Sequence, residues 1–312
     1  MTSDLNPELS KMTGARQTMS SWSKNIESFE DIPDIYKSFY KTAVGDFKNF
    51  PHTVLAPPIA GMRRRNSVER LICEANDTIY IWTRSGKQIT SMEYSLNNIS
   101  DFEVGRILLF SWLTIHGVTN TGEKTTSTIE FNTSSFRHYE YFVNKMRSMP
   151  SLINKHIVSE GKNKFESLAD ENFKFMNYAT ESLMGGEEVV KIVWQPEMSN
   201  PVFALWGHVF HRRILSMAHL VILTNKELIL IQEDERSTLN RGVRYGGKWQ
   251  YIALNKIKAV SVLERADDLL ALVLTFFPGE RQVEIMFMAS KRQDLIQFQA
   301  EFNQMMAVTQ PL

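Results

Sequence analysis

The chain has 312 residues, of which 43% are hydrophobic and 11% aromatic, enough to build sizeable cores and to argue against wholesale disorder. Lys and Arg together number 35, and Asp and Glu also number 35, so the formal net charge is zero. This balance argues against nucleic-acid binding, which requires an excess of positive charge. At roughly 150 residues per domain, the length predicts about two domains.

The N-terminal region is polar before it becomes apolar. Residues 1–30 are rich in Ser, Thr and Asn without apolar periodicity, and we expect a disordered or loosely attached tail. A short helix is expected from Pro33, with Ile35, Phe39 and Ala43 on its buried face.

Neither a signal peptide nor a membrane span is predicted. The N-terminus lacks an apolar stretch, and the longest apolar run, residues 107–115, is far shorter than the roughly 20 residues that cross a bilayer. Cys73 is the only cysteine, which excludes an intrachain disulfide and a Cys-based zinc site, and we interpret it as a small core residue. The expected location is the cytoplasm.

Two series of short strands follow, each ending in an amphipathic helix. The first series is expected at 69–74, 78–83, 89–96, 99–104, 107–116 and 125–132, with a helix at 134–149 that buries Phe136, Tyr139, Val143 and Met146. The second is expected at 188–194, 219–223, 228–232, 249–254, 257–263, 269–277 and 281–288, with a final helix that buries Leu295, Phe298, Phe302 and Met306. A helix at 164–183 connects them and ends before Gly185-Gly186.

The two series repeat one pattern. Leu96-Asn97-Asn98-Ile99 returns as Leu254-Asn255-Lys256-Ile257, and Gly122-Glu123-Lys124 returns as Gly279-Glu280-Arg281 at nearly the same spacing. A strongly bent antiparallel sheet leaves one end of its interior open, and a helix at the end of the chain can close it. Two copies of one small β domain explain the repeat.

This order resembles that of bacterial PH-like domains, relatives of pleckstrin-homology and GRAM modules. The resemblance lies in the strand-Asn-turn-strand start, the Leu-Asn-x-Ile strand entry and the helix after a Gly-turn hairpin. It is clearest over 218–308 and weaker over 50–149. It implies a seven-stranded bent barrel capped by a helix in each copy, and it constrains fold better than function.

The expected fold class is therefore α+β and mainly β, with two PH-like bent antiparallel β-barrels, each capped by a C-terminal helix, and a helical connector. The expected organisation is an N-terminal tail at 1–30, a first PH-like domain with a short leading helix at 31–150, the connector at 151–186 and a second PH-like domain at 187–308.

Two basic segments are candidate anion-binding sites. The loop 234–248 is longer than its counterpart in the first copy and carries Arg236, Arg241, Arg244 and Lys248. The resemblance implies that such a strand-connecting loop could hold anionic groups, because guanidinium groups match phosphate oxygens. The alternative is a solvated loop, in which Asp234 and Glu235 offset part of the charge.

The second basic segment, Arg63-Arg64-Arg65, could attract an anionic membrane. Together with Asn66-Ser67, it also has the form of a basophilic kinase site. An ordinary exposed loop is the favoured interpretation.

The sequence contains no recognisable catalytic motif. His208 and His211 would share a face of a helix but lack further zinc ligands nearby, so we favour core packing over a metal site. Nucleophile-elbow, phosphate-loop, dinucleotide-binding and His-Glu-x-x-His motifs are all missing. We therefore expect no enzymatic activity, no cofactor and no metal.

Three functions remain in order of preference. The first is a non-catalytic interaction module of two PH-like domains that binds a protein or peptide. The second is peripheral attachment to anionic lipid at the inner face of the membrane through the basic loops. The third is an enzyme whose site lies between the copies.

Overall fold

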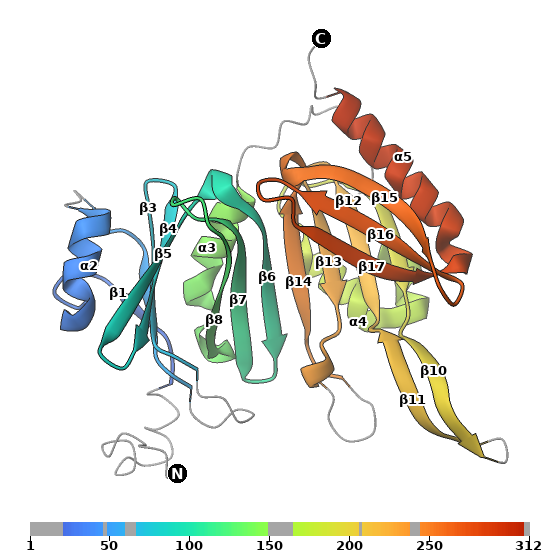
Figure 1. Cartoon of the computed structure of the whole chain (residues 1–312), viewed down its shortest axis with the longest axis horizontal. Helices are drawn as coiled ribbons and strands as arrows, with labels where there is room; N and C mark the ends of the chain where they lie inside the picture. Colours follow the sequence, from blue (N-terminus) through green and yellow to red (C-terminus); the bar gives the residue numbers. More distant parts are fainter. Residues whose placement is uncertain are drawn as a thin grey trace. The chain divides into compact units, whose positions relative to one another are not determined.

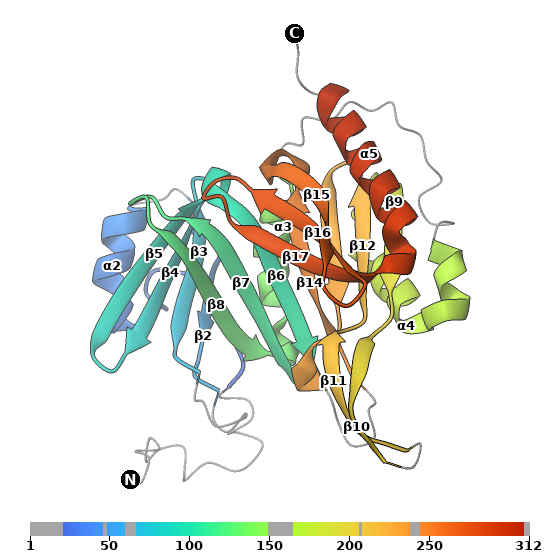
Figure 2. The ribbon, with the colours of Figure 1, turned by 45° about the vertical axis from the view of Figure 1, so that its right-hand side comes forward.

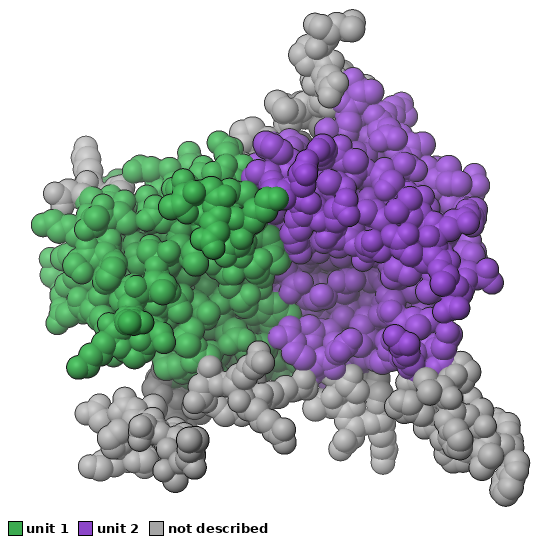
Figure 3. Space-filling view, viewed as in Figure 1, with its two compact units in different colours: residues 1–99, 106–148 green, residues 100–105, 149–312 purple. Residues whose placement is uncertain are grey.

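The computed structural model describes residues 21–45, 49–59, 67–148, 165–205, 208–237 and 244–308, without the side chains of 201–212, 237 and 308. Four of the seven predicted anion-site residues lie outside the described residues, namely Arg63, Arg64, Arg65 and Arg241. The chain divides into two compact units, with residues 1–99 and 106–148 in unit 1 and residues 100–105 and 149–312 in unit 2 (Figure 3). Strands predominate over helices in the described residues, which confirms the mainly β expectation.

Unit 1 contains a five-stranded antiparallel sheet, a β-hairpin and two helices (Figure 1). The sheet has the order β1 (Lys24–Ile26), β2 (Thr53–Ala56), β3 (Arg70–Ala75), β4 (Thr78–Ser85) and β5 (Gln88–Ser95). The hairpin is β7 (Phe110–Val118) with β8 (Lys124–Asn132), and the helices are α2 (Asp34–Val44) and α3 (Arg137–Arg147). Strand β1 and the bonded Ser23 lie within the segment that the sequence assigns to the tail.

The larger segment of unit 2 contains helix α4 (Glu166–Ser182) before its strands and helix α5 (Arg292–Val308) after them. One sheet contains β9 (Val189–Gln195), β12 (His219–Thr224), β13 (Glu227–Gln232) and β14 (Gly247–Ala253), side by side in that order. A second contains β15 (Ile257–Arg265), β16 (Leu269–Phe276) and β17 (Gln282–Met288), and a two-stranded ribbon contains β10 (Met198–Leu205) and β11 (His208–Ser216).

The core of unit 2 lies between its two larger sheets and α5, which runs along β9 and β15 (Figure 2). Helix α5 buries Leu295, Phe298 and Phe302 as predicted, but Met305 is buried and the predicted Met306 only partly so. Met305 and Met306 lie three and four residues after Phe302, and helical spacing allows either on the buried face. Packing against the sheet therefore determines which methionine is buried.

Helix α4 covers the other face of the first sheet. The ring centroid of Phe175 lies 4.4 Å from that of Trp194, and Tyr178 lies 4.8 Å from Trp249. Alternate residues of a strand face opposite sides, so the tryptophans meet α4 while their neighbours face the core.

A short piece of the first sequence copy belongs to unit 2. Strand β6 (Ile99–Ile107) contributes residues 100–105 to this unit. The buried carboxylate of Asp101 accepts a hydrogen bond from Gln250 Nε2 at 2.6 Å and forms an ion pair with Arg281. The basic residue of the repeated Gly-Glu-basic turn therefore has a specific structural partner in this copy.

The buried face of α2 differs from the prediction. Tyr36, Tyr40 and Val44 are buried, whereas the predicted Phe39 is 41% exposed. The two tyrosines bury their rings while their hydroxyls reach polar partners, since Tyr36 donates to Glu69 at 3.2 Å and Tyr40 bonds to Thr53 at 3.3 Å. The prediction placed Phe39 on the buried face and left out the two tyrosines, so the predicted face of the helix differs from the observed one.

The repeated Leu-Asn-x-Ile motif has the same local structure in both copies. Each forms a one-turn 3₁₀ helix, Leu96–Asn98 after β5 and Leu254–Lys256 after β14, and a strand begins at the Ile that follows. The backbone N–H of Leu96 donates to the carbonyl of Asp77 at 2.8 Å, and that of Leu254 donates to the carbonyl of Lys226 at 3.2 Å, each acceptor lying in the turn two strands earlier. The repeat is thus a structural corner.

These corners also explain a correction to the predicted barrels. No sheet in the described part of the chain closes into a barrel. In unit 2 the strands before Leu254 and those after Ile257 lie in different sheets, because the 3₁₀ turn redirects the chain between them. The seven strands therefore form open sheets around a shared core.

Candidate functional site

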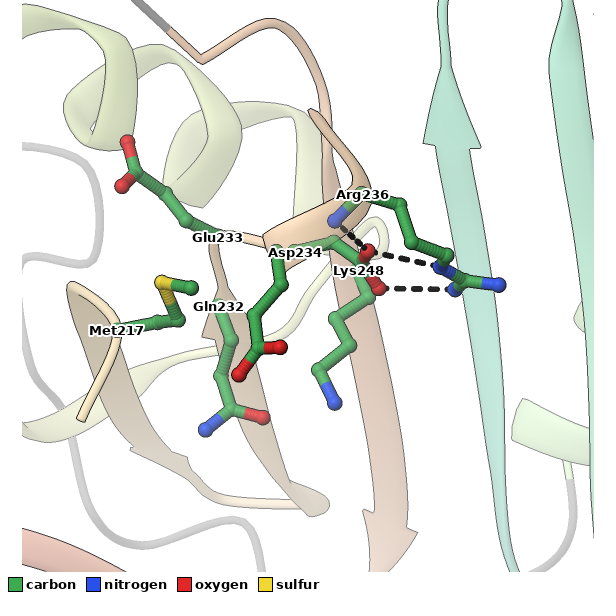
Figure 4. Close-up of a pocket in the computed structure, with 7 residues that line it drawn as sticks. Met217, Gln232, Glu233, Asp234, Arg236 and Lys248 are labelled. Carbon is green, nitrogen blue, oxygen red and sulfur yellow. Dashed lines mark hydrogen bonds and ion pairs between the residues drawn. The ribbon is translucent and has the colours of Figure 1, made fainter. Parts of the chain in front are cut away.

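The candidate site is a pocket of about 370 Å³ in unit 2, at the end of β13. It is lined by the side chains of Met217, Gln232, Glu233, Asp234, Glu235, Arg236 and Lys248 (Figure 4). These residues come from the β11–β12 turn, the end of β13, the 3₁₀ turn Glu235–Ser237 and β14. The pocket therefore lies at the base of the long basic loop.

One arginine of the loop is engaged by its neighbour Asp234. Arg236 donates to the two carboxylate oxygens through Nε and a terminal nitrogen, each at 2.8 Å, and its backbone N–H donates at 2.8 Å (Figure 4). Burial alone would raise the pKa of Asp234, but the hydrogen bonds and charge of Arg236 outweigh burial and lower it. This pair closes a tight turn at the rim of the pocket.

Arg244 belongs to a network of ion pairs that includes Glu233 of the pocket lining. It pairs with Glu197 and, at 3.0 Å, with Glu233, which also receives the ammonium group of Lys174 from α4. Burial alone would lower the pKa of Arg244, but the two carboxylates raise it. These contacts tie the end of the loop to α4 and to the start of β10.

Lys248 is held more loosely. Its ammonium group lies 3.4 Å from the carboxylate of Glu103. Figure 4 shows its side chain extending in the same direction as the carboxamide of Gln232, whereas Arg236 points away. Lys248 is therefore the cation of this pocket best placed to meet a ligand.

Two of the seven predicted anion-site residues, Arg236 and Lys248, line the pocket, and a third, Arg244, pairs with the lining residue Glu233. Arg236, Arg244 and Lys248 each lie beside a carboxylate. The pocket wall itself carries three carboxylates and two cations. In the described part of the loop, carboxylates offset the charge of the basic side chains, so this part does not form a cationic surface.

A row of polar side chains crosses the sheet beside the pocket. The strand register pairs His219 with Gln195 on one side and Gln232 on the other, and Gln232 pairs with Lys248. Residues directly opposite in antiparallel strands share a face, so all four lie on the face that carries the core. Gln195 accepts a hydrogen bond from the backbone N–H of Met288 at 3.0 Å.

His219 is the member of this row that sequence reasoning missed. Its ring is buried, and Nδ1 donates to the carbonyl of Met217 at 2.8 Å, so Nε2 carries the lone pair. Nε2 has no hydrogen-bond partner among the described residues. Burial lowers the pKa of His219 to about 4, although the bond to Met217 opposes the shift. The available signal in the sequence was a histidine directly before the apolar run Leu220–Leu223.

Other candidates from the sequence have different surroundings. The backbone of 208–216 is a strand, so His208 and His211 are not on a helix, and their side chains lie outside the described part. No group of three or more metal-binding side chains occurs in the described residues. Ser67 is buried and its Oγ accepts from the backbone N–H of Ile59 at 2.5 Å, so this hydroxyl is not presented to a kinase.

Within the described ranges, no helix is long and apolar enough to cross a membrane. Comparison of the chain with protein-family models gives no match, and comparison with curated proteins gives none. Function therefore has to be argued from the residues of the site.

Proposed function

We propose that the chain is a non-catalytic binding module of two PH-like units and that it binds a peptide segment of a partner protein at the pocket of unit 2. The PH-like assignment is supported by the order of elements in this unit. Apart from the β10–β11 ribbon, four antiparallel strands, β9 and β12–β14, precede the Leu-Asn-x-Ile corner, three strands follow it, and α5 ends the unit. Without that ribbon, the seven strands and final helix agree with the number of elements that the resemblance implies.

The observation that carries the peptide proposal is the chemistry of the pocket. Its arginine has a bidentate carboxylate partner, while Gln232 offers an uncharged donor and acceptor beside the apolar Met217 and the cation Lys248. A carboxamide can pair with a backbone amide, and a mixed lining suits a peptide better than a uniformly anionic surface.

Selection from a displayed library of random linear peptides tests this function. We expect enriched peptides to bind the full chain, and Gln232→Leu to weaken their binding at least tenfold. The matched control is Gln293→Leu, on the exposed side of α5, which should leave binding unchanged. Repeated selections without enrichment, or enriched peptides that bind the two variants equally, would reject the pocket as a peptide site.

A further inference from the structure

The turn between β6 and β7 exposes two adjacent leucines. Strand β6 ends at Ile107 and β7 begins at Phe110, so Leu108 and Leu109 form the turn (Figure 1). Their side chains are 57% and 58% exposed. Among the described residues, no other two consecutive large apolar side chains are exposed. Sequence periodicity predicted an unbroken strand at 107–116, so this tip is a feature of the structure alone.

The turn also has an unfavourable backbone for leucine. Leu108 has a φ of 53°, a region that glycine, Asn and Asp tolerate better than a branched apolar residue. The other non-glycine residues with positive φ in the described part are all polar: Asn76, Asp77, Asp267, Asp268 and Glu280. Backbone strain of this kind is concentrated at functional sites.

The second copy provides a comparison within the same chain. The turn that follows the equivalent strand, between β15 and β16, contains Asp267 and Asp268 at φ of 61° and 55°. The fold therefore accommodates the usual polar turn residues at this corner. In unit 1 the turn consists of two exposed leucines, of which Leu108 also has the strained backbone.

Two arginines, Arg106 and Arg137, lie on the segments next to the leucine tip. Arg106 places its guanidinium carbon 3.8 Å from the ring centroid of Phe136, and the exposed Arg137 follows that ring. The carbonyl of Leu109 accepts from the backbone N–H of Thr133 at 2.9 Å, which brings this segment to the tip. Residues 104–114 and 131–138 contain no Asp or Glu, and the acidic residues nearest to them in the chain are Glu103, Glu130 and Glu140.

We propose that the Leu108–Leu109 tip inserts into the interface of an anionic lipid bilayer, with Arg106 and Arg137 beside the lipid headgroups. Exposed apolar side chains gain free energy on entering this interface, and nearby basic residues add attraction to anionic lipid. An apolar protein pocket would accept the leucines but gives no reason for the surrounding positive charge. This site lies in unit 1 and does not depend on the pocket of unit 2.

Vesicle binding by the full chain tests the proposal. We expect co-sedimentation with vesicles of phosphatidylserine and phosphatidylcholine, and much weaker binding to phosphatidylcholine alone. The double variant Leu108→Gly/Leu109→Asn should reduce partitioning at least tenfold, because each leucine contributes about fivefold when buried. Gly-Asn is a favoured hairpin turn, so this variant should melt no lower than the wild type.

Three further variants make the test specific. Phe39→Gln removes an exposed apolar side chain elsewhere on unit 1 and should bind vesicles like the wild type. Leu109→Trp should show new fluorescence quenching by brominated lipid. A variant with Arg63, Arg64 and Arg65 changed to Gln should retain most of the binding that the leucines provide.

The proposal is overturned if the wild type binds neither vesicle type, which would favour a protein as the occupant. It is also overturned if the folded double variant binds as well as the wild type. Loss of binding only in the arginine variant would assign attachment to that segment instead.

Discussion

Lowering the pH from 7 to 5 should destabilise unit 2 through His219. The ring is buried, and Nε2 has no partner among the described residues, so a proton there would create a charge without compensation. Burial lowers the folded-state pKa to about 4, whereas an unfolded histidine has a pKa of about 6.5. The unfolded state therefore binds the proton more readily over this range.

The sign and size of the effect follow from proton linkage. Stability from the neutral ring is fully present above about pH 6.5 and is lost as the pH falls toward 4. At about 1.36 kcal/mol for each pKa unit, the complete loss is roughly 3 kcal/mol, of which about 2 kcal/mol occurs between pH 7 and pH 5. This loss is a large fraction of the stability of a typical domain.

Pulse-labelling hydrogen exchange during urea unfolding can follow β12 and β13 and thus report on unit 2 alone. The comparison is with His219→Asn, which keeps a donor near the Met217 carbonyl but does not titrate. The variant loses the contact of the ring with Phe287, so it should be less stable at both pH values. Its unfolding free energy should nevertheless fall by about 2 kcal/mol less than that of the wild type between pH 7 and pH 5. Equal falls in both proteins would refute the reasoning.

Two other predictions concern unit 1. A Cβ at Gly117 would lie 2.4 Å from the backbone oxygen of Asn98, so Gly117→Ala should destabilise the unit by about 3 kcal/mol in urea unfolding. Gly185→Ala lies in unit 2, where a Cβ meets nothing within 4 Å, and should leave the unfolding free energy of its own unit nearly unchanged; similar losses in both variants would contradict the steric argument. Burial raises the pKa of the Cys73 thiol to about 11, so iodoacetamide at pH 8 should alkylate the native protein about a hundredfold more slowly than the urea-unfolded chain. Native and unfolded rates within threefold of each other would show that the thiol is accessible.

Much of the element order was predictable because it depends on local signals. Strand alternation and turn residues located β3, β4, β12 and β13 to within a few residues. The Leu-Asn-x-Ile repeat identified two equivalent points, and both are 3₁₀ corners. Local periodicity failed where two apolar faces competed, as in α2, and where leucines formed a turn between β6 and β7.

The candidate site was predictable only in part. Loop length and composition drew attention to Arg236, Arg244 and Lys248, but their carboxylate partners include Glu197 and Glu103, which are remote in sequence. Nothing in single-sequence periodicity indicates such pairings. The same applies to His219, whose significance arises from burial and strand register.

The sequence by itself determined the mainly β composition, the duplicated order of strands and helices, and the position of the divergent loop. These properties follow from side-chain periodicity and turn preferences, which act over a few residues. Only the tertiary structure decided which charges are compensated, which polar atom is buried without a partner, and which leucines remain exposed. Each of these depends on groups brought together from distant strands, where burial and Coulomb attraction act through space.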